Sequence, residues 1–184
     1  MPVLLPILTS LYLLLGILYF GFKKPSYSHI KDTISELGEY GSKHAKLVNY
    51  GLFLPVGVLL FIIAFLNSSN NVVVGLSISL GIGYVVSAFF PCDPGSPFTG
   101  SGRQQVHNLG GFFEYAGGLL FLMRASEQEL SFFNIDYKLL AFMVIVCIII
   151  TSIPKNPIRG LAQRIAELIL FASLIHLSST PVIS

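Results

Sequence analysis

Charged residues are scarce in this sequence, and the shortage decides which solvent surrounds most of the chain. Asp, Glu, Lys and Arg make up only 11% of the 184 residues, whereas hydrophobic residues make up 53%. The mean hydropathy of +0.76 lies far outside the balance of a soluble domain. The formal net charge is only +2, and the chain has no separate basic arm, which argues against a nucleic-acid partner. We therefore expect a protein that lies mainly in a lipid bilayer.

Cysteine is rare as well, and the two residues present do not suggest a disulfide framework. Cys147 lies inside a long apolar run and Cys92 lies in a loop, so a disulfide would have to join the membrane interior to a loop. We expect two free thiols. No Lys or Arg precedes the first apolar run, Lys23 and Lys24 follow it, and no small-residue cleavage site is evident. We therefore interpret this run as a retained helix and not as a signal peptide.

Six apolar runs follow one another along the chain. A membrane span needs roughly 17 to 25 residues, so the fourth and fifth runs have to include flanking residues. The expected helices cover residues 3–22, 47–66, 72–90, 109–125, 137–153 and 160–178. Lipid offers the backbone no hydrogen-bond partner, so each span is expected to be a helix. The sequence thus predicts an all-α, polytopic membrane protein whose single domain, residues 1–184, is a bundle of six transmembrane helices.

Positive charge is distributed unequally between the two sides of the expected membrane. The connections after helices one, three and five, with the start of helix six, hold Lys23, Lys24, Lys31, Lys43, Lys46, Arg103, Lys155, Arg159 and Arg164. The opposite side holds Arg124 and Lys138. Basic loops remain in the cytoplasm, so both termini are expected on the non-cytoplasmic side of the cell (inner) membrane.

The first expected cytoplasmic loop contains the segment Ser-His-Ile-Lys-Asp-Thr-Ile-Ser-Glu-Leu-Gly, residues 28–38. On a helix its apolar residues Ile30, Ile34 and Leu37 would share one face. The polar residues His29, Asp32 and Glu36 would lie on the other face, and Gly38 would suit a C-terminal cap. The pattern predicts a short amphipathic helix at the membrane interface, whose polar face either meets solvent or belongs to an inward-facing site.

The third loop ends in a glycine-rich stretch just before the fourth helix. Gly100, Gly102 and Arg103 precede that helix, where free backbone N–H groups and the helix dipole favour an anion. A phosphate-bearing head group would fit this position. The alternative is that Arg103 only follows the general excess of positive charge on the cytoplasmic side.

The fourth helix carries ionisable residues together with glycines on one face. His107, Gly111, Glu114 and Gly118 follow one another at spacings of four, three and four. A carboxylate at this depth is costly unless it is paired or protonated, so Glu114 is expected to face protein. It is either a functional group or a partner in a buried hydrogen bond.

Two further helices carry patterned residues. The third has small residues at intervals of four, which we expect to pack closely against another helix: Gly75, Ser79, Gly83 and Ser87. In the sixth, Arg164 and Glu167 lie about one turn apart, and we favour a pair between them. The alternative is that they complete a buried network around Glu114.

Three motifs considered together resemble one known family. They are Tyr-Ser-His-x-x-Asp-Thr-Ile-Ser-Glu-Leu-Gly at 27–38, Phe-Phe-Pro-Cys-Asp-Pro-Gly at 89–95, and a Gly-x-Gly-Arg stretch that leads to His107. The combination resembles the domain-of-unknown-function 998 family, which consists of multi-pass membrane proteins, mostly prokaryotic. The resemblance implies the architecture over nearly the whole chain, and it implies no reaction. Its motif residues carry over as site candidates: Ser28, His29, Asp32, Ser35, Glu36, Asp93 and His107.

Our leading functional hypothesis is a cytoplasm-facing polar pocket for a lipid head group or a small anionic ligand. The expected ligand-binding residues are Ser28, Ser35, Glu36, Gly100, Gly102 and Arg103. A membrane-embedded hydrolase is an alternative, with catalytic candidates His29, Asp32, Asp93, His107 and Glu114, of which the first four are also candidate metal ligands. A proton-coupled transporter that uses Glu114, a structural or assembly partner, and a homo-oligomer also stay open. The spacing matches no metal signature, and the sequence indicates no particular cofactor.

Overall fold

The computed structural model describes residues 3–180, and the protein is mostly helical, with 72% of its residues in helices. The long helices are α1 (Leu4–Lys23), α4 (Asn71–Phe89), α5 (Gly102–Glu127), α6 (Tyr137–Ser152) and α7 (Arg159–Ser179). A further helix, 45–66, consists of α2 (Ala45–Val48), the π-helical turn η2 (Asn49–Phe53) and α3 (Leu54–Leu66). The remaining elements are the 3₁₀ helix η1 (Ser35–Gly38) and a hairpin of β1 (Ser131–Phe132) and β2 (Ile135–Asp136).

Four of these helices are long and apolar enough to cross a membrane: α1, 45–66, α4 and α7. Helix α6 is apolar but shorter. Helix α5 has 26 residues and is more polar, because it carries His107 and Glu114 on its buried side. The structure therefore shows an apolar, multi-helix protein with four candidate spans, and the predicted count of six spans stays a prediction.

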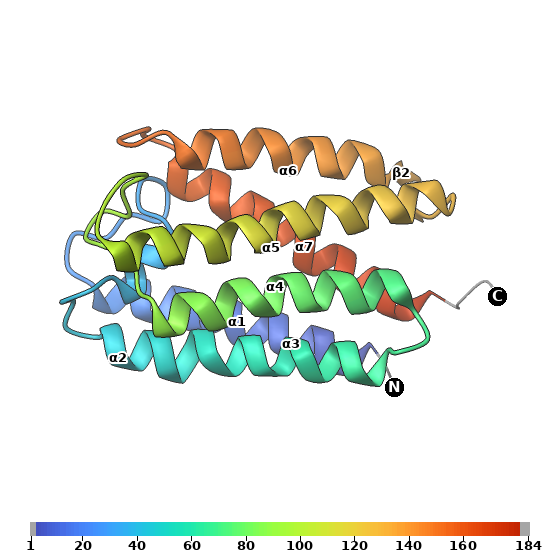
Figure 1. Cartoon of the computed structure of the whole chain (residues 1–184), viewed down its shortest axis with the longest axis horizontal. Helices are drawn as coiled ribbons and strands as arrows, with labels where there is room; N and C mark the ends of the chain where they lie inside the picture. Colours follow the sequence, from blue (N-terminus) through green and yellow to red (C-terminus); the bar gives the residue numbers. More distant parts are fainter. Residues whose placement is uncertain (1–2, 181–184) are drawn as a thin grey trace.

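The long helices lie side by side in a closed ring (Figure 1). Helix α3 contacts α1 and α4, α5 contacts α4 and α6, and α7 contacts α6 and α1. Helices α4 and α7 also meet across the ring. Helix α1 begins and α7 ends at one end of the bundle, whereas the loops after α1, α4 and α6 gather at the other end (Figure 1). The arrangement brings together, at one end of the bundle, the two loops that carry the motifs: the first loop, 24–44, and the third loop, 90–101. We call them the motif-rich loops.

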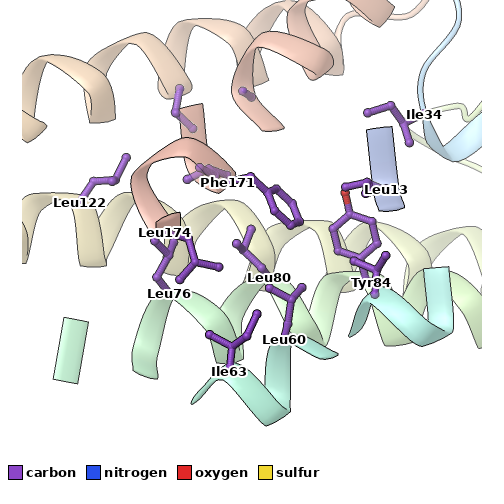
Figure 2. Close-up of a cluster of buried hydrophobic side chains, with 14 of the residues drawn as sticks. Leu13, Ile34, Leu60, Ile63, Leu76, Leu80, Tyr84, Leu122, Phe171 and Leu174 are labelled. Atoms are coloured by element: carbon purple, nitrogen blue, oxygen red, sulfur yellow. The ribbon is translucent and has the colours of Figure 1, made fainter. Parts of the chain in front are cut away.

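Large aliphatic and aromatic side chains fill the centre of the ring, as Figure 2 shows. Leu60 of α3, Leu80 of α4 and Leu174 of α7 are completely buried. Helices α4 and α5 approach each other through the predicted stripe of small residues: Gly75 lies against Phe121, and Ser79 lies against Gly117. The stripe is therefore a packing surface, since a side chain in place of Gly75 would overlap the Phe121 ring.

Helix α5 begins at Gly102, well before the expected start at residue 109. Ser101 caps it, because the Ser101 hydroxyl accepts a hydrogen bond from the Gln104 backbone N–H at 3.2 Å. The polar first turns are stable as a helix because they face protein, and both Gln104 and His107 are buried. Hydropathy alone could not find this start.

The first loop does not form the expected amphipathic helix over residues 28–38. Only the 3₁₀ helix η1, Ser35–Gly38, forms there, and Ile30 is exposed while Glu36 is buried. The reason is local hydrogen bonding by acidic side chains. The Asp32 carboxylate accepts from the Ser28 N–H at 2.6 Å, and the Glu36 carboxylate accepts from the Thr33 N–H and hydroxyl, both at 3.0 Å. These bonds fix turns where a helix was expected.

Candidate functional site

A cavity of about 410 Å³ lies at the end of the bundle where the motif-rich loops gather. His107, Gly111 and Glu114 of α5 form one wall, Arg159 and Gln163 of α7 form another, and Ile148 and Thr151 of α6 and Thr33 and Ser35 of the first loop complete it. A smaller cavity of about 20 Å³ adjoins it, and Glu114, Gln163, Ser35 and Ser87 line both. Glu114 therefore lies at the boundary between the two cavities.

Glu114 belongs to a buried hydrogen-bonded network at this boundary. Its carboxyl group lies within hydrogen-bonding reach of the carboxyl group of Glu167 on α7, and both residues line the smaller cavity. The Tyr84 hydroxyl of α4 and the Tyr115 hydroxyl of α5 each donate to a different oxygen of Glu167, both at 2.8 Å. Two carboxylates in contact cannot both be ionised, so the pair of Glu114 and Glu167 holds a proton between them. We call Glu114 and Glu167 the carboxyl pair.

Gln163 connects this network to the first loop. Its side-chain N–H donates to the Tyr115 hydroxyl at 3.2 Å, and its carbonyl accepts from the Ile34 N–H at 2.7 Å. Arg164 also holds the loop, donating to the Asp32 carbonyl at 2.9 Å and to the Tyr27 hydroxyl at 2.5 Å. Arg164 therefore does not pair with Glu167, contrary to the pairing we favoured, and the alternative of a network between Glu167 and Glu114 describes the structure.

Arg159 brings a positive charge to the wall of the cavity. The side chain is buried, with 9% of its surface exposed, and it donates to the carbonyls of Gly95 at 3.0 Å and Ser96 at 2.9 Å. Its Nε–H is buried without a hydrogen-bond partner within residues 3–180. None of the ion pairs in this part of the chain includes Arg159. The guanidinium thus has carbonyl partners but no counter-charge among the described residues.

His107 lines the same cavity, and its burial favours the neutral imidazole. Its Nδ1 lies 3.0 Å from the Phe90 carbonyl oxygen, which can only accept, so Nδ1 carries the hydrogen. Nε2 then has a free lone pair, and it has no partner within residues 3–180. His107 therefore offers the cavity a hydrogen-bond acceptor.

The position at the start of α5 that we expected to hold an anion is occupied by the protein's own carboxylate. The Arg103 guanidinium bonds to Asp93 at 2.5 Å and to the Pro91 carbonyl at 2.9 Å, and it lies over the Tyr40 ring. Asp93 also accepts from the Ser101 N–H at 2.7 Å and the Ser101 hydroxyl at 2.8 Å. These Ser101 bonds, and then Arg103, hold the pKa of Asp93 below its ordinary value. Gly100 and Gly102 lie outside the cavity lining.

The other candidates of the first loop have structural partners. His29 lies edge-on to the Tyr27 ring with centroids 5.3 Å apart, and burial, followed by the charge of Arg164, lowers its pKa. The Ser28 hydroxyl accepts from the Lys31 N–H at 3.3 Å, and Asp32 and Glu36 close the turns described above. Of the five catalytic candidates, only His107 and Glu114 line the cavity. Residues 3–180 contain no group of three or more His, Cys, Asp or Glu side chains that could hold a metal ion.

We predicted no site role for Arg159, Gln163, Tyr84 or Tyr115, and for Glu167 only a pair with Arg164 or a network around Glu114. Arg159, Gln163 and Glu167 follow one another at intervals of four on α7, a spacing that places polar groups along one side of a helix. This pattern could have indicated a polar face of the helix that is directed at a site. Tyr84 and Tyr115 offered no comparable signal, because tyrosines are common near membrane interfaces.

One of the comparisons with known proteins identifies the family of the chain. The model of the family described as proteins of unknown function (DUF998) matches residues 7–180, so the chain belongs to this family. The resemblance predicted from the three motifs is thereby confirmed. No curated protein and no solved structure matches the chain.

Proposed function

We propose that this DUF998 protein binds, within a cell (inner) membrane, a lipid whose head group carries a phosphate. The observation that carries the proposal is the buried Arg159 guanidinium on the wall of a cavity of about 410 Å³. In this proposal all six long helices span the bilayer, both termini are non-cytoplasmic, and the cavity lies at the cytoplasmic end.

The buried charge of Arg159 supports this proposal. Taking a guanidinium out of water is costly, and two carbonyl partners compensate only part of that cost. Its unused donor, Nε–H, belongs to a planar group that matches phosphate oxygens well. A bound phosphate would supply both the missing charge and the missing acceptor.

Exposed apolar residues of the cavity lining also support the proposal. Phe98 of the third loop is 65% exposed and Phe112 of α5 is 64% exposed, and both line the cavity together with Ile148 of α6. These side chains therefore form an apolar, partly exposed section of the lining, contributed by the third loop, α5 and α6. A lipid could enter from the bilayer, place its head group at Arg159 and leave its acyl chains along the outside of these helices.

The experiment measures phospholipid binding to the purified, delipidated full-length protein in detergent. Replacing a charged hydrogen-bond partner costs about 1.5–3 kcal/mol, so Arg159→Gln should weaken binding by roughly tenfold or more. Arg124→Gln is the matched control, because Arg124 is exposed and pairs only with Glu127 on its own helix. Equal binding by native protein and Arg159→Gln would contradict the proposal.

A membrane-embedded hydrolase is a second candidate, and one observation favours it. His107, a neutral imidazole with a free nitrogen, and Glu114, a member of the carboxyl pair, line the same cavity. Such groups can act as a base and an acid on a bound ester. Release of a phosphate-containing head group from bound lipid, abolished in His107→Gln, would support hydrolysis; intact lipid after prolonged incubation would leave binding as the function.

A further inference from the structure

The carboxyl pair holds at least one proton, and the hydrogen bonds around it indicate which carboxyl group is ionised when it holds only one. Gln163 donates to the Tyr115 oxygen, so the Tyr115 hydroxyl hydrogen is directed at Glu167. The Tyr84 hydroxyl donates to the other oxygen of Glu167. Both oxygens of Glu167 thus act as acceptors, so in the singly protonated pair the proton belongs to Glu114, which can donate it to Glu167.

No positive side chain neutralises this charge within residues 3–180. Arg164, the nearest basic residue along α7, donates to Asp32, Gly160 and Tyr27. Arg159 is two helical turns from Glu167, a rise of roughly 12 Å, which is too long for an ion pair. None of the ion pairs in the described part of the chain includes Glu114 or Glu167.

The two adjoining cavities therefore have a positive end at Arg159 and, with one proton on the carboxyl pair, a negative end at that pair, where Glu114 lines both cavities and Glu167 lines the smaller one. His107 adds no charge in the neutral form that its burial favours. A ligand that bears only a phosphate would neutralise Arg159 and leave the carboxyl pair without a counter-charge. A ligand with a positive and a negative group would neutralise both.

We propose that the ligand's head group is zwitterionic, with its phosphate at Arg159 and a primary ammonium at the carboxyl pair. This inference rests on the proposed function and specifies its substrate class. The ammonium would reach the pair through Glu114, which lines the cavity and has Glu167 as its one hydrogen-bond partner within residues 3–180. The unprotonated oxygen of Glu114 can accept an ammonium hydrogen, and the charge of Glu167 lies directly behind it. The hydroxyls of Ser35 and Ser87 line the same cavities and can accept the remaining ammonium hydrogens.

The same geometry sets an order among head groups. A phosphoglycerol group satisfies Arg159 but brings no positive charge to the carboxyl pair. A phosphocholine group brings the charge, but its quaternary nitrogen has no hydrogen to donate. Phosphoethanolamine has a positive nitrogen that also carries hydrogens to donate, so the cavity should bind it in preference to the other two head groups.

The experiment compares three phospholipids with identical acyl chains on the full-length protein in detergent, measured as competition against a fluorescent phospholipid. Phosphatidylethanolamine should bind at least tenfold more tightly than phosphatidylglycerol or phosphatidylcholine. The double variant E114Q/E167Q should lose this preference while it still binds phosphatidylglycerol. The control E127Q/E129Q makes the same chemical change at exposed positions and should keep the preference.

The outcomes separate this inference from the proposed function. If no phospholipid binds, or if Arg159→Gln has no effect, the proposed function fails. If binding depends on Arg159 but the three lipids bind equally, only the zwitterion inference fails, and this result needs no carboxyl variant to fold. Displacement by soluble phosphoethanolamine as readily as by the lipid would keep the head-group chemistry and make the source a soluble metabolite.

Discussion

Arg159 and Glu167 lie two turns apart on α7, and neither has a partner of opposite charge in the part of the chain that the structure describes. Gln163 lies between them on the same helix and joins the first loop to the Tyr115 hydroxyl. A single helix thus places Arg159 on the large cavity and Glu167 on the small cavity that adjoins it. This separation is the basis of both proposals, because a direct ion pair would leave nothing for a ligand to neutralise.

The tyrosines that donate to Glu167 should contribute strongly to stability. Tyr84→Phe and Tyr115→Phe each remove one donor to a buried carboxylate, which should cost about 1–3 kcal/mol. Tyr50→Phe is the control, since Tyr50 is half exposed and its hydroxyl has no hydrogen bond within residues 3–180. The measurement is the free energy of unfolding in mixed micelles. A loss in Tyr50→Phe as large as in Tyr84→Phe would contradict the assignment of the charge to Glu167.

The sequence was sufficient for the all-helical character of the fold and for the environment of Glu114. Apolar runs indicated apolar helices, because lipid leaves an apolar helix few alternatives, but they did not indicate the start of α5. The expectation that Glu114 faces protein agrees with its 7% exposure, since a carboxyl group in contact with lipid would be too costly. Each of these features depends only on the residues of a single helix.

The partners of the polar groups could not be predicted, because they come from distant segments. Arg164 is held by the Asp32 carbonyl and the Tyr27 hydroxyl, so it is not available to Glu167 one turn away. Arg103 meets Asp93 across a loop whose path no periodicity describes. The anion-binding candidate of the sequence was therefore already occupied, whereas Arg159, which received no role, lines the cavity.

Two glycines on α5 should respond oppositely to alanine. At Gly117 a methyl group would overlap Ser79 of α4, so Gly117→Ala should destabilise the bundle by about 1–3 kcal/mol. At Gly111 no atom lies within 4 Å of the new methyl group, so Gly111→Ala should be neutral or stabilising by up to about 1 kcal/mol. Thermal unfolding of both variants in one detergent measures the difference. Equal melting temperatures would show that α4 and α5 do not pack at Gly117.

The interaction between Asp93 and Ser101 should depend on pH in the acidic range. The folded protein lowers the pKa of Asp93 below 3.8, chiefly through the Ser101 N–H and hydroxyl and then through Arg103. A depressed folded pKa stabilises the protein above the unfolded value, and that stability is lost as pH falls through the folded value. Asp93→Asn should therefore lower the melting temperature at pH 7, and the difference should shrink below pH 3.8. A difference that is constant with pH would mean that the carboxylate charge does not matter.

The direction of the chain across the membrane can be tested with introduced cysteines. Ser69 lies in the short connection between α3 and α4, and Lys31 lies in the first loop, and both are exposed. If the basic loops are cytoplasmic, a membrane-impermeant maleimide applied to intact cells should label Ser69→Cys and leave Lys31→Cys unlabelled until the cells are permeabilised. The native thiols should give little background, because Cys92 and Cys147 are buried and burial raises the pKa of the Cys92 thiol to about 12. The reverse labelling pattern would place the cavity on the outer side, so the lipid would have to enter from the outer leaflet.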